Sequence, residues 1–463
     1  MTGFSLIIVF VLAIIIMIVA ISKFNIHPFL AIMAVSLILG LIAGIPLVDT
    51  VDADGKKISG ITSVIGAGFS GTFSSIGIVI ILGALIGSIL EQTGAAMKLA
   101  DMIIKLVGKN HPVLAMELMG WVVSIPVFCD SGFVILNPIR KALVDRTGIS
   151  SVAMTVGLSS GLYISHVFIP PTPGPIAAAS TIGIGDNLLL VMGMGALCSI
   201  LPLIAGYFYA NYIGNKVKAN DESDKNEVKQ TYEQLVKEYE HLPNGFIAIA
   251  PIIVPIILMA LNSIVSMAKM TGFLANMLKF LGTPIIALTV GTIFGIVQLV
   301  GAKKIDKFYD ITNGTLKTVG PILFVTAAGG VLGKVIASTD MVDFITRNAS
   351  AFERIGIFFP FILAAILKSA QGSSTVAITT TAGIVAPLLS VLGLGSPVRA
   401  ALAVMAIGAG AMTVSHANDS YFWVVTNFGS MTPEQGYKTQ TVDTLILGLA
   451  GMLEIFVLSL ILH

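Results

Sequence analysis

Long apolar segments alternate with short polar ones along the whole chain. A helix that crosses a bilayer needs about 20 apolar residues, and many of these segments approach that length. They lie at residues 4–21, 28–46, 73–90, 150–168, 187–212, 245–266, 284–301, 318–337, 397–414 and 441–462. The pattern therefore predicts an all-α, polytopic membrane protein with about ten transmembrane helices.

Two further apolar regions, residues 113–137 and 356–391, are interrupted by clusters of Gly, Pro, Ser and Thr. Such clusters break regular helices, and we expect both regions to be re-entrant hairpins. Residues 161–166 and 410–416 interrupt two of the spans in a similar way, and each ends in Ser-His. Irregular backbone at membrane depth is tolerated only inside the protein or around a cavity, so paired interruptions point to a transporter's binding site.

The composition agrees with a membrane protein, because 55% of the residues are hydrophobic and only 11% are charged. The net charge of +1 offers no broad basic surface for nucleic acid. Cys129 and Cys198 sit in apolar surroundings without metal-type spacing, so we expect neither a disulfide nor a metal site, and no cofactor. Residues 4–21 have no basic segment before them and no cleavage site after them, which favours a spanning helix over a signal peptide.

The distribution of basic residues predicts how the chain is oriented. If the N-terminus lies outside, most of the 26 Lys and Arg residues fall on segments inside the cell. Those segments are residues 22–27, 91–112, 138–149, 213–244, 302–317 and 431–440. We therefore predict that both termini lie outside and that the two halves enter the membrane from opposite faces. This is the arrangement of two inverted repeats.

We expect three parts along the chain. An N-terminal membrane repeat covers residues 1–214, and a C-terminal membrane repeat covers residues 245–463. Residues 215–244 between them are strongly charged, with apolar residues at helical spacing from Val228 to Tyr239. We interpret this part as a cytoplasmic linker with an amphipathic helix.

In the first half, the candidate functional residues lie near the interruptions. Asp130 stands beside Ser131 and Gly132 in an apolar hairpin, where an ionised carboxylate is costly unless it is paired, hydrated or protonated. This suits a residue that binds and releases a proton, and the alternative is a carboxylate held by backbone N–H groups at the hairpin tip. His166 precedes a proline-rich run that contains Thr172 and cannot continue a helix. It is either functional or a hydrogen-bonded packing residue.

In the second half, one motif begins at Lys368 and continues to Gly372, Ser373, Ser374 and Thr375. Helix N-termini present free N–H groups and a positive dipole end, so together with hydroxyl donors they can hold a carboxylate without an arginine. Hydroxyls that both donate and accept also suit the OH groups of a sugar acid. The alternatives are small residues for tight helix packing and a lysine that extends to the membrane interface.

A denser polar cluster comprises Ser415, His416, Asn418, Asp419 and Ser420. His416 and Asp419 are three residues apart, so any helical turn would bring them together and couple their protonation. Three further acids lie in the apolar segments or at their ends without an indicated role: Glu91, Glu117 and Glu454.

Taken together, these motifs resemble the gluconate permease family of bacterial proton symporters, within the larger ion transporter superfamily. The resemblance rests on residues 126–134, on His166 and the prolines after it, on residues 372–377 and on residues 415–423, and it spans nearly the whole chain. It implies proton-coupled uptake of gluconate or a similar hydroxy acid across a bacterial inner membrane. It also implies a homodimer in which a transport domain, holding both hairpins and both broken spans, slides like an elevator against a scaffold. Because Asp130 stands where the family's gluconate transporters carry glutamate, a smaller acid such as glycerate is an alternative substrate.

We therefore predict a secondary active transporter rather than an enzyme, with a small hydroxy-acid anion, the proton and the lipid bilayer as partners. The expected substrate-binding residues are Ser131, Gly132, Thr172, Gly372, Ser373, Ser374, Thr375, Ser415, Asn418 and Ser420. The expected proton-coupling residues are Asp130, His166, His416 and Asp419. Two alternatives are a sodium-coupled carboxylate transporter and, more remotely, an intramembrane hydrolase with a Ser, His and Asp set.

Overall fold

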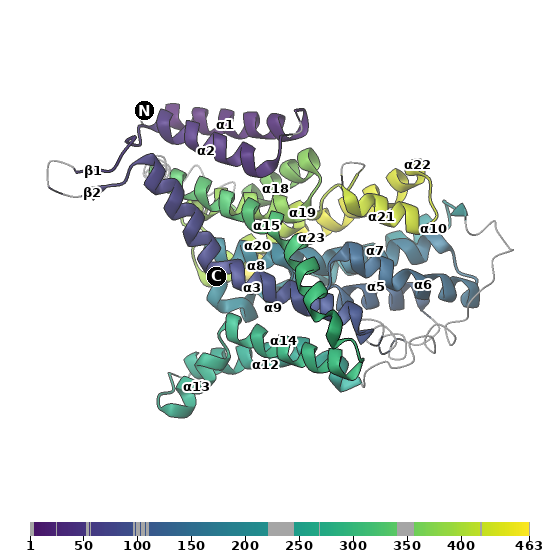
Figure 1. Ribbon diagram of the computed structural model, residues 1–463. Coiled ribbons are helices and arrows are strands. Elements are labelled where there is room, and N and C mark those ends of the chain that lie inside the picture. Colours follow the sequence, from purple (N-terminus) through teal and green to yellow (C-terminus); the bar gives the residue numbers. More distant parts are fainter. Residues whose placement is uncertain are drawn as a thin grey trace.

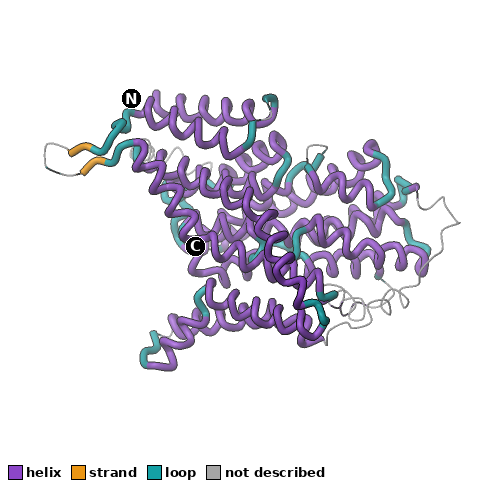
Figure 2. Tube along the Cα trace, in the orientation of Figure 1, coloured by secondary structure: helices purple, strands orange, loops and turns teal. Residues whose placement is uncertain are grey.

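The computed structural model describes residues 4–24, 26–51, 55, 57–95, 98, 102, 107, 111–220, 245–267, 269–339, 356–416 and 419–462 (Figure 1). Nearly all of this described part is helical, and its only strands form one short hairpin (Figure 2). In that hairpin β1 (Thr50–Val51) and β2 (Lys57–Ile58) are antiparallel, with Thr50 opposite Ile58.

The helices of the first half are α1 (Phe4–Ser22), α2 (Pro28–Ala43), α3 (Ile61–Gln92), α5 (Pro112–Val123), α6 (Cys129–Thr147), α7 (Ser151–Phe168), α8 (Pro173–Ile182), the 3-10 helix η1 (Gly185–Asn187), α9 (Leu188–Leu197) and α10 (Ile200–Gly214). Those of the second half are α12 (Gly245–Met267), α13 (Phe273–Leu281), α14 (Pro284–Gly301), η3 (Ile305–Lys307), α15 (Phe308–Ala337), α18 (Phe358–Gln371), α19 (Ser374–Val385), η4 (Ala386–Leu388), α20 (Pro397–Met412), α21 (Ser420–Phe428), α22 (Pro433–Gly436), the π-helix η5 (Tyr437–Thr441) and α23 (Val442–Ile461).

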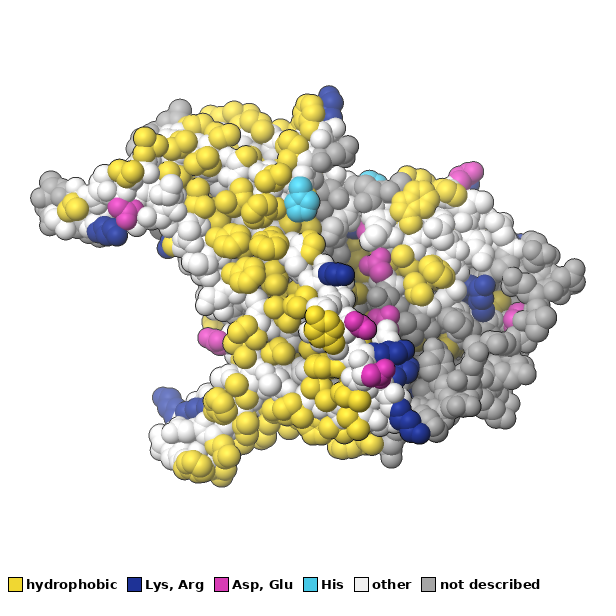
Figure 3. Space-filling model, viewed as in Figure 1, with side chains coloured by type: hydrophobic (Ala, Val, Ile, Leu, Met, Phe, Trp, Pro, Cys, Tyr) yellow, Lys and Arg dark blue, Asp and Glu magenta, His cyan; other side chains and the backbone are white. Residues whose placement is uncertain are grey.

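Within the described residues, six helical segments are long and apolar enough to cross a membrane. They are Ser151–Ile182, Gly185–Gly214, Gly245–Ser266, Pro284–Gly301, Ile305–Ala337 and Pro433–Ile461. Apolar side chains are exposed on the outer pair α1 and α2 and on the group α12 to α14, which lies on the opposite side of the bundle (Figure 3). Such apolar surfaces are expected of helices that face lipid. The predicted all-helical membrane fold is confirmed, whereas the number of spans stays a prediction.

The interior of the bundle is formed by α7, α8, α19 and α20, which are buried on almost every face. Two glycines allow the closest contacts. A Cβ atom on Gly161 of α7 would lie 1.8 Å from the carbonyl oxygen of Glu117 in α5, and one on Gly410 of α20 would lie 2.2 Å from that of Phe361 in α18. Helix backbones can approach this closely only where no side chain intervenes. Small residues therefore serve packing in both halves.

The helices are interrupted close to all four predicted motifs. The described non-helical residues are 124–128 between α5 and α6, 169–172 between α7 and α8, 372–373 between α18 and α19, and 413–416 after α20. The prediction for residues 161–166 is wrong, because these residues continue α7 as a regular helix and the break comes at the proline run that follows. The small side chains there let α7 pack on α5 rather than end the helix.

Three predictions about the architecture remain predictions. They are the re-entrant course of the two helix pairs α5/α6 and α18/α19, the inverted repeat, and the division of the chain at residues 214/215 and 244/245. Most of the expected linker, including the whole of its helix from Val228 to Tyr239, lies outside the described residues.

Candidate functional site

A buried ion pair joins the two broken helices of the second half. Lys368, in the last turn of α18, is completely buried, and its Nζ donates to Oδ2 of Asp419 over 2.6 Å. The same Nζ donates to the carbonyl oxygen of Gly372, where α18 ends, and lies 5.7 Å from the centre of the Tyr163 ring in α7. An ammonium group is tolerated at this depth because a carboxylate, a carbonyl and an aromatic ring face it.

Asp419 is the N-cap of α21, and both of its carboxylate oxygens accept hydrogen bonds. Besides the lysine, Ser415 Oγ donates to Oδ2 over 2.6 Å, and the backbone N–H of Tyr421 donates to Oδ1 over 3.1 Å. A carboxylate at this position satisfies free N–H groups and complements the positive end of the helix dipole. The cap and the ion pair together fix the orientation of the carboxylate.

Ser415 itself is held in the non-helical backbone that follows α20. Its N–H donates to Thr444 Oγ1 over 2.9 Å, and its carbonyl oxygen accepts from Thr441 Oγ1 over 2.7 Å. The preceding Val414 has a φ of 63°, a left-handed conformation that is an outlier for a β-branched residue. Backbone strain of this kind costs roughly 1–3 kcal/mol and clusters at functional sites.

The N-terminus of α6 faces the N-terminus of α21. Ser420 Oγ donates to Asp130 Oδ1 over 3.2 Å, and Cys129 Sγ lies 3.7 Å from Asp130 Oδ2. Ser131 and Gly132 belong to the same first turn of α6. The structure therefore brings the first-half acid next to the second-half cluster, close to two helix ends that favour negative charge.

Hydroxyl groups gather at the N-terminus of α19. The Ser373 side chain caps the helix by accepting a backbone N–H three residues on, over 3.3 Å, and Ser374 and Thr375 are buried in the first turn. Gly372, just before them, has a φ of 90°, which favours glycine. The Lys368 ammonium group donates to the carbonyl oxygen of Gly372, so the ion pair lies next to the start of α19.

His416 and Asp419 have different side-chain partners, although the sequence suggested that they would meet. Residues 413–416 are not helical, so the spacing of three residues does not place the two side chains on one helical turn. His416 Nε2 lies 3.1 Å from the carbonyl oxygen of Ser369, near the end of α18. Asn418, another predicted site residue, lies outside the described residues.

His166 and Thr172 lie at the end of α7. His166 is buried and its ring stacks on Tyr163, with 6.5 Å between ring centres and 10° between planes. Thr172 Oγ1 donates to the carbonyl oxygens of Ile169, over 2.7 Å, and His166, over 3.0 Å. The His166 ring therefore packs on an aromatic ring, and the Thr172 hydroxyl closes the end of α7. Tyr163 connects them to the ion pair, because its ring contacts both His166 and Lys368.

Two aromatic residues of the cluster were not selected from the sequence. The rings of Tyr163 and Tyr421 lie 5.0 Å apart, and Tyr421 Oη donates to the carbonyl oxygen of Ser159 over 3.2 Å. The sequence could have indicated both, because each tyrosine lies within or directly beside a predicted polar motif. The sequence left open whether the Lys368 side chain lies in the interior or extends to the membrane interface. The structure places it in the interior.

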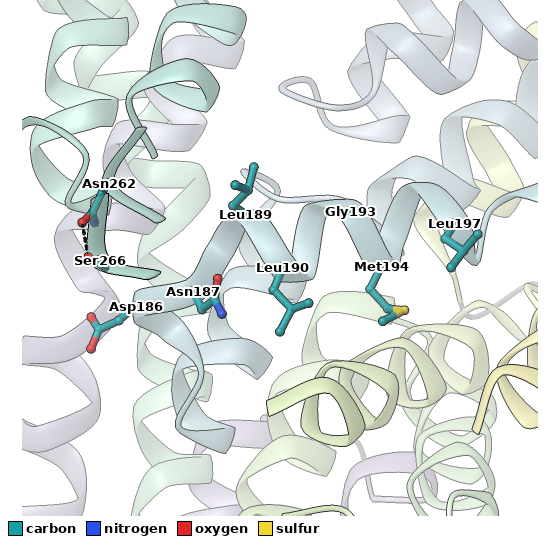
Figure 4. Close-up of a pocket in the computed structure, with 9 residues that line it drawn as sticks. All are labelled: Asp186, Asn187, Leu189, Leu190, Gly193, Met194, Leu197, Asn262 and Ser266. Atoms are coloured by element: carbon teal, nitrogen blue, oxygen red, sulfur yellow. Dashed lines mark hydrogen bonds between the residues drawn. The ribbon is translucent and has the colours of Figure 1, made fainter. Parts of the chain in front are cut away.

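An open pocket of about 630 Å³ lies away from this cluster, between α9 and α12 (Figure 4). Asp186, Asn187, Asn262 and Ser266 supply its polar atoms, and Ser266 Oγ donates to Asn262 Oδ1 over 3.2 Å. None of the residues around the buried ion pair lines it. The polar cluster at the helix breaks is therefore the better candidate site, since its charges are buried and oriented.

Comparisons with known proteins agree over the whole chain. Residues 5–461 match the model of the GntP family permeases. The chain is 30% identical to the inner membrane permease YgbN of Escherichia coli over 98% of each protein, and 29% identical to a gluconate permease of Pseudomonas aeruginosa over 96% of each. Its fold is similar to that of the YdaH transporter of Alcanivorax borkumensis, with a TM-score of 0.63, 15% identity, and coverage of 94% of this chain and 99% of that one.

Proposed function

Because this chain belongs to the GntP family of permeases, we propose that it carries gluconate or a related sugar acid across the bacterial inner membrane together with protons. It is a multi-pass transport protein and not an enzyme. The gluconate permease among its relatives supports the substrate class, and the inner membrane permease supports the location. Proton coupling is inferred from the chemistry of the polar cluster.

One observation carries the proposal: the buried pair of Lys368 and Asp419 at the helix breaks. Charged groups inside a membrane protein are rare and mark substrate pathways and proton relays. The pair is neutral as a whole, so without substrate the fixed cation of Lys368 is compensated by Asp419.

In the proposed cycle, Asp419 exchanges places with the substrate carboxylate. When Asp419 takes up a proton, it no longer compensates the charge of Lys368, and the ammonium group becomes free to pair with an incoming carboxylate. The charge of Lys368 is then compensated again, because one proton and one anion have entered together. Compensation in both states keeps the energetic cost of crossing the bilayer low.

The surrounding residues suit a polyhydroxylated acid. The N-terminus of α19, with Ser373, Ser374 and Thr375, supplies donors for the carboxylate. Asp130 and Ser420 supply acceptors and a donor for sugar hydroxyls, and Asp130 is also a proton acceptor. The other residues assigned to this site are Ser131, Gly132, Thr172, Gly372, Ser415 and Asn418 for substrate, with His166 and His416 for the proton.

The function is tested with purified protein in proteoliposomes. We expect labelled gluconate to accumulate when an inward proton gradient is imposed and sodium is absent. Glycerate, threonate, fructuronate and D-serine are added as competitors to rank the substrates. Uptake that requires sodium, or that is indifferent to the proton gradient, contradicts proton coupling.

The assigned residues are tested in the same assay. We expect Asp419→Asn and Asp130→Asn to abolish accumulation and His416→Ala to lower it, because each removes a group that binds a proton or positions one that does. Glu91→Gln is the matched control, since this half-buried carboxyl at the end of α3 lies outside the cluster. Undiminished accumulation after Asp130→Asn and His416→Ala rules out their assignment.

We also propose a homodimer in which the interior helices move against the lipid-facing ones. The outer group α12 to α14 and the pair α1 and α2 expose apolar surface and are the candidate scaffold. The mass of the protein in detergent, measured by light scattering with the detergent contribution subtracted, should be that of two chains.

A further inference from the structure

A second polar cluster lies where α5, α7, α10 and α23 pack together. Glu117 of α5 and Asp443 of α23 are both completely buried. The hydroxyl of Ser160 in α7 donates to Asp443 Oδ2 over 2.9 Å. A Cβ atom on Gly206 of α10 would lie 2.7 Å from Glu117 Oε1 and 3.0 Å from Ser160 Cβ. The two carboxyl groups are therefore neighbours, close enough to interact electrostatically.

Little in the described part of the chain compensates a negative charge there. Both oxygens of Glu117 and Oδ1 of Asp443 have no hydrogen-bond partner among the described residues. None of the salt bridges between described residues involves either group. An ionised carboxylate without a partner is strongly disfavoured in such surroundings, and two adjacent ones are disfavoured further. A proton bound to the pair removes charge and supplies a donor where donors are missing.

Among the residues that the structure describes, two phenols are the further ionisable groups that interact with the pair. Tyr209 of α10 and Tyr421 of α21 both interact electrostatically with Asp443. Basic residues on adjoining elements have partners elsewhere. Lys438 of η5 pairs at the surface with the glutamate four residues before it, and Arg140 of α6 donates to oxygen atoms at the start of α7 and the end of α21.

A π-helix, η5, immediately precedes α23, whose second residue is Asp443. This rare conformation occurs frequently at functional sites. It buries Gln440, whose Oε1 accepts from Ser159 Oγ over 2.7 Å, while its Nε2 has no partner within the described ranges. The cluster thus holds both an unused donor and unused acceptors, as expected of a place that exchanges a proton or a water molecule.

Tyr421 connects this cluster to the substrate site. Its backbone N–H donates to Asp419, and its hydroxyl donates to the carbonyl oxygen of Ser159 over 3.2 Å. Tyr163, whose ring faces the ion pair, follows Ser159 by about one turn of α7. Tyr421 and α7 therefore contact both clusters.

We propose that Glu117 and Asp443 form a second proton-binding site, which carries a coupled proton separately from the substrate. This inference rests on the proposed function. The proton moves from the outer solution onto a carboxylate oxygen of the pair, stays there while the substrate crosses, and is released to the cytoplasmic solution. With one proton at Asp419 and another at the pair, uptake of a singly charged anion transfers one net positive charge.

The test counts protons per substrate in proteoliposomes that contain a pH-sensitive dye and take up labelled gluconate. Glu117→Gln and Asp443→Asn keep the shape of a protonated acid but cannot release its proton. In each variant we expect the number of protons per substrate to fall by one and the inward current to vanish. Accumulation at a gradient of about one pH unit should fall about tenfold, because one pH unit is a factor of ten for each coupled proton. Exchange of labelled for unlabelled substrate should continue near the wild-type rate.

Glu454→Gln is the matched control, since Glu454 is a carboxyl of the same helix as Asp443 whose Oε2 accepts from the N–H of Leu201 over 2.9 Å. It should leave the proton count unchanged. An unchanged count in both amide variants overturns the inference and leaves the proposed function intact. Loss of exchange in both variants also overturns it, because the pair is then structural. A wild type that takes up gluconate without any proton overturns the proposed function instead.

Discussion

Two buried groups of ionisable residues in the described part of the chain differ in which partners compensate their charge. At the helix breaks, Asp419 receives hydrogen bonds from a lysine ammonium, a hydroxyl and a backbone N–H. Between α5, α7 and α23, the described residues give Glu117 and Asp443 a single donor, the hydroxyl of Ser160. The first group is a satisfied ion pair, and the second is a pair of acids without a cation.

The difference shows that burial alone does not decide what an acidic residue does inside a membrane protein. In a satisfied ion pair, the carboxylate of an anionic substrate can replace the acidic residue as the partner of the fixed cation. A buried acid without a cation has little to exchange except its proton. The two groups are therefore suited to different ligands, one to a carboxylate and the other to a proton.

The largest effect is expected from removing one member of the ion pair. Lys368→Met leaves Asp419 buried without its cation, and loss of one partner of a buried pair costs about 3–5 kcal/mol. We expect the free energy of unfolding in detergent, measured by denaturant titration, to fall by about this amount and uptake to cease. In the double variant Lys368→Met/Asp419→Asn both charges are gone, so part of the stability should return.

Glu117→Gln tests the second group by the same measurement, the free energy of unfolding. No ion pair is broken among the described residues, so we expect the free energy of unfolding to change by less than about 1 kcal/mol. If this variant is destabilised as strongly as Lys368→Met, the distinction between a satisfied ion pair and an acid without a cation is wrong.

An effect smaller than that of Lys368→Met but larger than that of Glu117→Gln is expected from the packing that encloses Glu117. In Gly161→Ala the new Cβ meets the carbonyl oxygen of Glu117, and neither backbone can yield without separating α5 from α7. Overpacking of this kind costs about 1–3 kcal/mol. Gly193→Ala in α9 is the control, because nothing lies within 4 Å of its added Cβ, and it should gain about 0.5–1 kcal/mol. Equal melting temperatures for the two variants would contradict the close contact of α5 and α7.

The smallest effect is expected at an exposed carboxylate outside the membrane-spanning helices. Hydrogen bonds from the Ser63 hydroxyl, the Gly60 N–H and Lys57 hold the pKa of Asp49 well below its usual value of about 3.9. Its contribution to stability is therefore present above about pH 4 and is lost as the pH falls further. Asp49→Asn should lower the melting temperature slightly at pH 7 and make it less sensitive to acidification. If the melting temperature of Asp49→Asn falls as much on acidification as that of the wild type, the hydrogen bonds to Asp49 do not contribute to stability.

Much of the site was predictable because its residues are polar in apolar surroundings. Asp130, the hydroxyls after Gly372 and the cluster around Asp419 stand out in the sequence without any structure. The pairing of Asp419 was not predictable, because its partner Lys368 lies 51 residues earlier. Sequence spacing suggested His416 instead, but spacing predicts contacts only within a regular helix, and the described residues 413–416 are not helical.

The pair of Glu117 and Asp443 illustrates the same limit. Glu117 carries no local signal beyond being an acid among apolar residues, and Asp443 stands at the start of the last helix. Only the packing of α5 and α23 around α7 brings the two together.

By itself, the sequence determined the all-helical membrane fold, the neighbourhood of the helix breaks and the polar chemistry gathered there. Hydrophobic length, helix-breaking residues and the cost of buried charge are local properties that can be read one segment at a time. The tertiary structure decided which buried charge meets which partner. That choice depends on contacts between helices far apart in the chain. It makes one group an ion pair and leaves the other as two acids that are stable when protonated.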